Sequence, residues 1–184
     1  EAGTGGAIYR TGKGVTNLYN LTFTENKARS AYSHYSNKNF LGNGGAIELN
    51  QAGQTTIYSG VFKNNIATGE SGYSYGCGGA ISAYLTNLSI QKYTGDLLFE
   101  GNSSDYCGGA INAYGSTTQV LGISDVPLKN NSSFHGGALY LSCRADIHGA
   151  TEITGNTATY GGAIWNIGAN TTIRSSTVIK GNTA

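Results

Sequence analysis

Residues 136–164 read GGALYLSCRADIHGATEITGNTATYGGAI, and this stretch contains one complete copy of the pattern that decides the fold. The copy opens with Gly-Gly-Ala before Leu139 and continues to Ile153, which stands three positions before Asn156. It closes where Gly-Gly-Ala begins again at Gly161. Self-similarity at a period of about 20 to 50 residues is the sequence signature of repeat architectures.

Two short motifs alternate along the whole chain, with six copies of each. From the first glycine of one motif to the apolar residue of the next, the chain always advances 17 to 21 residues. From the asparagine to the following glycine pair, the distance ranges from 5 to 18 residues. One corner of the repeat therefore accepts insertions while the rest is constant, which is typical of a solenoid. The Gly-Gly-Ala-Ile/Leu motifs begin at Gly5, Gly44, Gly78, Gly108, Gly136 and Gly161.

The chemistry of both motifs favours coils stacked with parallel strands. A glycine pair adopts backbone angles closed to other residues and permits close approach at a corner. The asparagine is expected at a turn, where it tolerates left-handed geometry, and asparagines stacked at about 4.8 Å form an amide ladder. The predicted interior column is Phe23, Phe62, Phe99, Leu128, Ile153 and Ile179, and the predicted ladder is Asn26, Asn65, Asn102, Asn131, Asn156 and Asn182.

The repeats predict an all-β fold: a parallel β-solenoid of about six coils, forming one domain over residues 1–184. Helices need apolar residues every three to four positions over about ten residues, and no stretch of the chain shows this. An antiparallel sandwich has no reason to repeat one tetrapeptide. A propeller blade takes about 40–50 residues, which is longer than the later repeats.

The alternation of GGA[IL] with FxxN resembles the polymorphic membrane protein repeats of chlamydial-type autotransporters. In this chain it reads GGAI, FTEN, GGAI, FKNN, GGAI, FEGN, GGAI, LKNN, GGAL, ITGN, GGAI and IKGN. The resemblance covers the whole chain and implies a right-handed parallel β-helix that is displayed on a cell surface and acts in adhesion. An extracellular or cell-surface location is therefore expected.

The two ends of the chain are complementary in the phase of the repeat. Joining the end to the start would place Asn182 and Gly5 7 residues apart, close to the spacing in the later coils. Either the chain is cut from a longer passenger, or copies stack head to tail into a filament. We expect a structural subunit of an extracellular fibre whose partner is a second copy, with an adhesin passenger segment as the alternative. The predicted assembly ends are Gly5, Gly6, Ala7, Ile8, Ile179 and Asn182.

Two of the three cysteines stand at equivalent positions of consecutive coils. Cys77 and Cys107 each precede a glycine pair, and equivalent positions of stacked coils lie about 4.8 Å apart, within the range of a disulfide. A Cys77–Cys107 disulfide is predicted, with two stacked buried thiols as the alternative. Cys143 has no equivalent and is expected to be free and buried, with an intermolecular bridge as the alternative.

The two longest insertions, residues 27–43 and 66–76, leave the same corner of adjacent coils. They are rich in tyrosine, which supplies amphipathic contact area at low entropic cost. This composition favours recognition of a glycan or a surface protein; the alternative is that the loops pack on each other. The candidate residues are Tyr32, His34, Tyr35, Phe40, Tyr73 and Tyr75.

Composition argues against several functions. Charged residues make up 11% of the chain and the net charge is +1, which gives no electrostatic surface for nucleic acid or anionic lipid. No apolar stretch approaches the roughly 20 residues that span a bilayer. Acidic residues and histidines occupy no consistent position in the coil, so no carboxylate pair, metal cluster or catalytic triad is supported. We predict no enzyme activity and no cofactor; a carbohydrate-active β-helix enzyme is the least favoured alternative.

Overall fold

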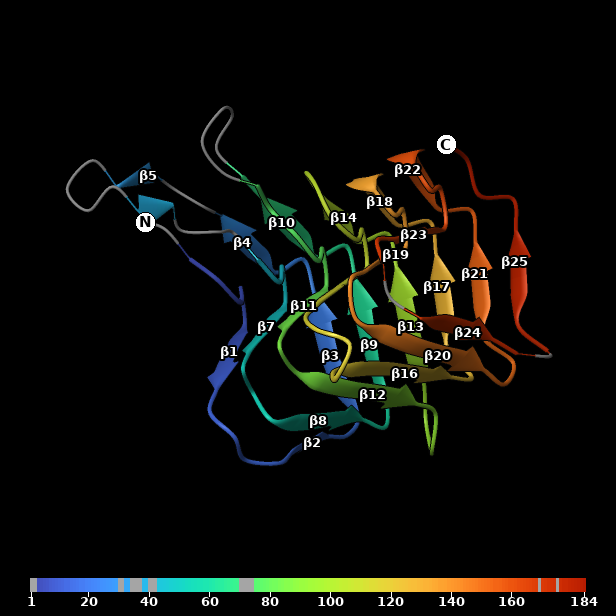
Figure 1. The fold of residues 1–184 in the computed structure, drawn as a ribbon, viewed down its shortest axis with the longest axis horizontal. Coiled ribbons are helices and arrows are strands. Elements are labelled where there is room, and N and C mark those ends of the chain that lie inside the picture. The colour runs from blue at the N-terminus through green and yellow to red at the C-terminus, as the bar shows by residue number, and fades with distance from the viewer. Residues whose placement is uncertain are drawn as a thin grey trace.

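The computed structural model describes residues 3–29, 32–33, 38–39, 43–69, 75–168, 170–174 and 176–184. These residues form a parallel β-solenoid whose coils follow one another along one axis, coloured from blue to red in Figure 1. The right-handed parallel β-helix of about six coils predicted from the sequence is confirmed.

Four parallel sheets run along the solenoid, and each coil contributes one strand to each sheet in turn. The first sheet contains β1 (Ile8–Thr11), β7 (Ile47–Asn50), β11 (Ile81–Tyr84), β15 (Ile111–Tyr114), β19 (Leu139–Leu141) and β23 (Ile164–Asn166). The second sheet contains β2 (Thr16–Leu18), β8 (Gln54–Ile57), β12 (Asn87–Gln91), β16 (Val120–Ser124), β20 (Arg144–His148) and β24 (Thr171–Ile173).

The third and fourth sheets complete the coil. The third contains β3 (Leu21–Thr24), β9 (Gly60–Lys63), β13 (Leu97–Glu100), β17 (Pro127–Lys129), β21 (Glu152–Thr154) and β25 (Val178–Lys180). The fourth contains β4 (Lys27–Arg29), β10 (Ile66–Thr68), β14 (Ser103–Ser104), β18 (Ser132–His135) and β22 (Thr157–Tyr160). The first insertion carries an antiparallel pair, β5 (Tyr32–Ser33) and β6 (Lys38–Asn39).

The strands pair in register, so that equivalent residues of successive coils lie over one another. In the third sheet Phe62 pairs with Phe23 on one side and with Phe99 on the other. The rings of Phe62 and Phe99 are nearly parallel, with centroids 4.4 Å apart, and both side chains are fully buried. Phe23 stacks on Phe62 at 4.9 Å. The interior column expected from the sequence is therefore present.

The last residue of that column is not buried. Ile179 pairs in register with Ile153, yet 45% of Ile179 is exposed, whereas Ile153 is fully buried. Ile179 belongs to the last coil of the structure, so a neighbour covers it on one side alone. Its predicted place in the column is right, and its burial is not.

Each glycine of the repeated pair is required for a different reason. The first adopts a left-handed backbone in every coil, for example with φ of 62° at Gly108. The second lies against the neighbouring coil: a Cβ on Gly109 would stand 2.2 Å from the carbonyl oxygen of Gly137. Real Cβ atoms do not approach this closely, so a side chain at this position would force the two coils apart.

The asparagines form a continuous ladder of buried amides. The backbone N–H and the Nδ2 of Asn102 both donate to Oδ1 of Asn131, at 2.9 and 3.0 Å. Nδ2 also donates to the carbonyl oxygen of Phe62 at 3.0 Å. In turn, Oδ1 of Asn102 accepts from the backbone N–H and Nδ2 of Asn65. The same pattern extends from Asn26 to Asn182.

The left-handed residue of this turn is not the asparagine, as the sequence suggested, but the residue before it. Glu25, Asn64 and Asn130 have φ of 57°, 55° and 56°, and glycine fills the same place in the other coils. The asparagine side chain is committed to the ladder, so its neighbour makes the turn.

The cysteines lie where the repeat places them. Cys77 and Cys107 are partners in a parallel bridge between consecutive coils. Burial and the hydrogen bond between the two thiols raise the pKa of Cys107. The structure carries both residues as free thiols, so the disulfide stays a prediction. Cys143 is buried, and burial raises the pKa of its thiol.

Replacing Phe62 by alanine tests the interior column. The Phe62→Ala variant is expected to lose about 3–5 kcal/mol of unfolding free energy, because it removes a ring packed on both faces. Denaturant unfolding measures this value. Tyr93→Ala, at a ring that is 77% exposed, is the control and should change stability by less than about 1 kcal/mol. If the two substitutions lowered the unfolding free energy equally, the stacked interior column would be contradicted.

Replacing Asn102 by alanine tests the amide ladder. We expect Asn102→Ala to cost about 3 kcal/mol or more, since each buried group left without a partner costs about 1–3 kcal/mol. The matched control is Asn182→Ala in the last rung, which water reaches and where the cost should be smaller. If both variants unfold at the same denaturant concentration, the buried rungs contribute no more to the unfolding free energy than the last rung does.

Candidate functional site

Exposed and half-buried aromatic side chains gather where the fourth sheet leads into the first, on both sides of the glycine pairs. The ring of Tyr75 stacks on that of Tyr106 at 4.2 Å, and Tyr106 lies 6.1 Å from Phe134 with the rings nearly parallel. Phe134 meets Tyr160 edge to face at 5.5 Å, and Tyr160 lies 5.6 Å from Trp165. We call these five residues the aromatic strip.

The repeat itself creates the aromatic strip. Cys107, His135 and Tyr160 occupy one position of successive coils, joined by parallel bridges, so rings at or beside this position lie next to one another. His135 packs between the rings, 4.9 Å from Tyr106. Aromatic pairs at such distances attract through their quadrupoles. The strip keeps open faces toward solvent, because Tyr75 is 55% and Phe134 40% exposed.

Among the residues whose side chains the structure describes, Tyr75 is the predicted recognition residue that belongs to this strip. Tyr32 lies in β5. The other predicted residues are His34, Tyr35, Phe40 and Tyr73, and they lie outside the described residues. Sequence reasoning missed Tyr106, Phe134, Tyr160 and Trp165. A signal was available, since an aromatic residue precedes the glycine pair by one or two positions in three successive coils.

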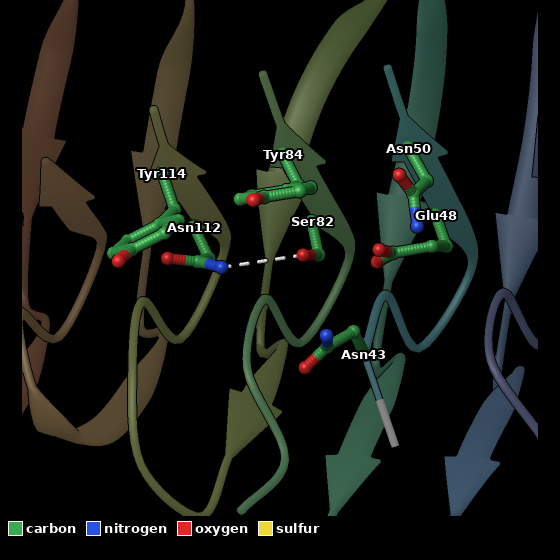
Figure 2. Close-up of a pocket in the computed structure, with 7 residues that line it drawn as sticks. All are labelled: Asn43, Glu48, Asn50, Ser82, Tyr84, Asn112 and Tyr114. Carbon is green, nitrogen blue, oxygen red and sulfur yellow. Dashed lines mark hydrogen bonds between the residues drawn. The ribbon is translucent and has the colours of Figure 1, made fainter. Parts of the chain in front are cut away.

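A second feature is a cavity of about 330 Å³ on the outer face of the first sheet. Glu48, Ser82 and Asn112 are in-register partners on β7, β11 and β15. They alternate with core residues such as Ile47, so their side chains point outward. Figure 2 shows these side chains together with the remaining lining residues, which are Asn43, Asn50, Tyr84 and Tyr114. We call this cavity the sheet pocket.

Among the described residues that line the sheet pocket, Glu48 is the one carboxylate. Although it points outward, it is only 3% exposed, and burial raises its pKa to about 7. A hydrogen bond with Ser82 partly offsets this rise. The burial of Glu48 could not be expected from the sequence, because other coils carry tyrosine, serine, asparagine or tryptophan at this position.

Other acidic side chains are engaged in ion pairs between neighbouring strands. Glu100 pairs with Lys63 at 2.8 Å, and Asp146 pairs with Arg174 through two hydrogen bonds of 2.9 Å. Among the described residues, no group of three histidine, cysteine, aspartate or glutamate side chains is placed to hold a metal ion. In the same part of the chain, no helix is long and apolar enough to cross a membrane.

Comparison with known proteins places the repeat in a family. The model of the Chlamydia polymorphic membrane protein repeat matches residues 20–49 and 96–114, and each stretch contains one asparagine rung and one glycine pair. A probable outer membrane protein of Chlamydia pneumoniae, pmp20, is 35% identical over an alignment 145 residues long, which covers 72% of this chain and 8% of that protein. The chain thus spans a small part of this relative's length. No solved structure gives a significant match. The chain belongs to the family of chlamydial-type polymorphic membrane protein repeats.

Proposed function

We propose that this chain is a structural unit of a cell-surface β-solenoid fibre, in which copies join head to tail through their end coils. The cell-surface location agrees with the outer-membrane location in the name of the Chlamydia pneumoniae relative. The observation that carries the proposal is the identical contact between successive coils, in which each asparagine of the ladder donates to the asparagine one coil further on.

The polarity of the hydrogen bonds supports joining in one direction. In the ladder, each asparagine donates to Oδ1 of the asparagine one coil further on, from Asn26 through to Asn182. At the corner, the N–H of Gly5 likewise donates forward, to the carbonyl oxygen of Asn43. At these two positions the last coil directs a donor outward and the first coil an acceptor, whereas N–H groups after the asparagine, such as that of Thr183, donate to the preceding coil. A second copy placed in phase would add the rung Asn182 to Asn26.

Backbone contacts at the fourth sheet support the same phase. Thr183 forms a parallel bridge with Thr157, beside β22, at one end of the solenoid. At the other end, the N–H of Gly3 donates to the carbonyl oxygen of Arg29 at the end of β4. The two segments thus occupy consecutive parts of one coil in neighbouring copies. An interface of this kind joins unlike surfaces and propagates without closing.

We also propose that this role requires no catalysis. The matched family is a repeat of outer membrane proteins and not an enzyme family. The ion pairs of Glu100 and Asp146 with cations of neighbouring strands support a structural role for these carboxylates.

Charge placed on the open end tests the fibre. The wild-type chain is expected to elongate at neutral pH, and Ile179→Asp should stay monomeric, because a carboxylate would be buried in the joint. Light scattering and negative-stain microscopy measure the length, and circular dichroism verifies the fold. Thr117→Asp, in an exposed turn of a middle coil, is the control and should elongate normally. A wild-type chain that remains monomeric would overturn the head-to-tail joint.

The aromatic strip favours a second candidate function, adhesion to a glycan or a surface protein. Exposed aromatic faces in a row accept sugar rings or apolar side chains, and contiguous exposed apolar patches mark interaction sites. The strip crosses successive coils and reaches Tyr160 on β22 and Trp165 on β23, which are edge strands of their sheets.

Removing two rings tests adhesion. The double variant Phe134→Ser and Tyr160→Ser should lower retention on a glycan array or on cultured cells by at least about tenfold, since two aromatic contacts are lost. Tyr93→Ser, at an exposed tyrosine in another corner of the coil, is the matched control and should bind as the wild type does. Equal retention of both variants would exclude the strip as the contact surface.

A further inference from the structure

Three buried oxygen atoms at the sheet pocket have no hydrogen-bond partner. They are Oδ1 of Asn43, Oε2 of Glu48 and Oδ1 of Asn112. Glu48 is 3% and Asn112 6% exposed, so neither side chain is open to bulk water. Buried polar groups in native proteins nearly always have a partner. These three atoms therefore indicate a ligand that the pocket accommodates.

The hydrogen bonds at the rim decide which kind of ligand fits. Asn112 donates from Nδ2 to Oγ of Ser82 at 3.2 Å, which leaves its Oδ1 on the side away from Ser82 (Figure 2). The hydroxyl of Ser82 is hydrogen-bonded to the carboxyl group of Glu48. The donors of Asn112 and Ser82 are thus used in hydrogen bonds among the lining residues themselves. The oxygen atoms that remain without a partner can only accept hydrogen bonds. A matching ligand must donate hydrogen bonds.

Two tyrosine rings flank these acceptors. Tyr84 and Tyr114 stack with centroids 5.6 Å apart and project from the same face as Glu48 (Figure 2). Tyrosine faces attract cations through the ring quadrupole. The pocket therefore combines a carboxylate, amide oxygens and aromatic faces, which together suit a ligand with positive charge.

We propose that the sheet pocket binds a primary ammonium group. An ammonium has N–H donors and no acceptor, which suits the open oxygens of Glu48 and Asn43, and its charge compensates the buried carboxylate of Glu48. A neutral polyol would leave that charge unpaired. Calcium takes six to eight oxygen ligands, whereas Glu48 is the one carboxylate among the described lining residues. The ammonium group belongs to a lysine side chain of a partner protein or to an amino sugar.

The pH dependence of binding follows from Glu48. Burial raises its pKa to about 7, and the ammonium group pairs with the ionised form. On this face the titratable neighbours from adjoining strands are tyrosines, namely Tyr9 on β1, Tyr84 on β11 and Tyr114 on β15. Because the ionised fraction of such a carboxyl rises about tenfold between pH 6 and pH 8, the affinity for an amine that stays protonated should rise about tenfold as well.

Titration of the isotope-labelled chain with butylamine tests the proposal. At pH 8 the side-chain amide signals of Asn43 and Asn112 should shift and saturate, and the affinity should fall about tenfold at pH 6. Glu48→Gln should abolish the shift, since the amide carries no charge, and Asp96→Asn, at an exposed carboxylate, should leave it unchanged. Nα-acetyl-lysine methylamide and glucosamine, compared at pH 7, separate the lysine source from the amino-sugar source.

Thermal unfolding gives a second readout. Folding raises the pKa of Glu48 from 4.5 to about 7, so the folded state holds this proton more tightly and the stability of the wild type should fall as pH rises from 4.5 to about 7 and then level off. Saturating butylamine should restore the unfolding temperature at pH 8, because it binds the folded state. Glu48→Gln should show neither the fall nor the rescue, while remaining folded.

Three results would overturn the proposal. They are the absence of saturable shifts at pH 8, retention of amine binding by Glu48→Gln, and equal binding of glucose and butylamine. The last result would assign a neutral sugar to the pocket. None of these results depends on whether the chain forms fibres, because the pocket lies on the side of the coils.

Discussion

The asparagine ladder is the interaction on which the rest of the structure depends. Each side chain accepts from a backbone N–H of the preceding coil and donates to the carbonyl oxygen of a strand residue in that coil, as Asn131 does with Asn102 and Phe99. Because these groups are buried, a coil that slipped by one residue would leave several of them without partners. The ladder thereby fixes the register of the third sheet, and with it the stacking of Phe62 on Phe99.

The interior and the side of the solenoid follow different rules. Inside, a column repeats one kind of residue, and a uniform column packs well at each level. On the outside the columns vary, as Glu48, Ser82 and Asn112 do in three successive coils. A uniform interior thus holds a variable surface in a fixed geometry. Both the aromatic strip and the sheet pocket are built from residues about 25 to 37 positions apart in the chain, brought together by that geometry.

The sequence predicted what the repeat determines. Two tetrads with near-constant spacing were enough to place the Phe23 column, the asparagine rungs and the corner that takes insertions. Local details were less accessible: the left-handed turn residue is Asn64 rather than Asn65, because the ladder occupies the asparagine. The burial of Ile179 was overestimated, because a pattern gives a residue its position but not the number of coils around it.

The sheet pocket could not be predicted from the pattern at all. Glu48 does not interrupt either repeated motif. Its burial depends on the side chains that neighbour it on adjacent strands, and these are known only once the residue-by-residue pairing of the strands is known. The exposed rings of Phe134 and Tyr160 were easier to predict from the sequence, since both residues lie beside a glycine pair. Their assembly into one strip still required the parallel bridges of the corner.

The glycine pair has a consequence for how such chains change in length. Its second member touches the same glycine of the next coil, as Gly109 touches Gly137, so every coil begins with an identical contact surface. A gene segment running from one glycine pair to the next, such as residues 136–160, encodes a unit whose two faces match those of any other unit. Duplication or loss of that segment alters the rod by one whole coil and leaves each remaining junction intact. Recombination between such codons would therefore yield longer and shorter rods that still fold.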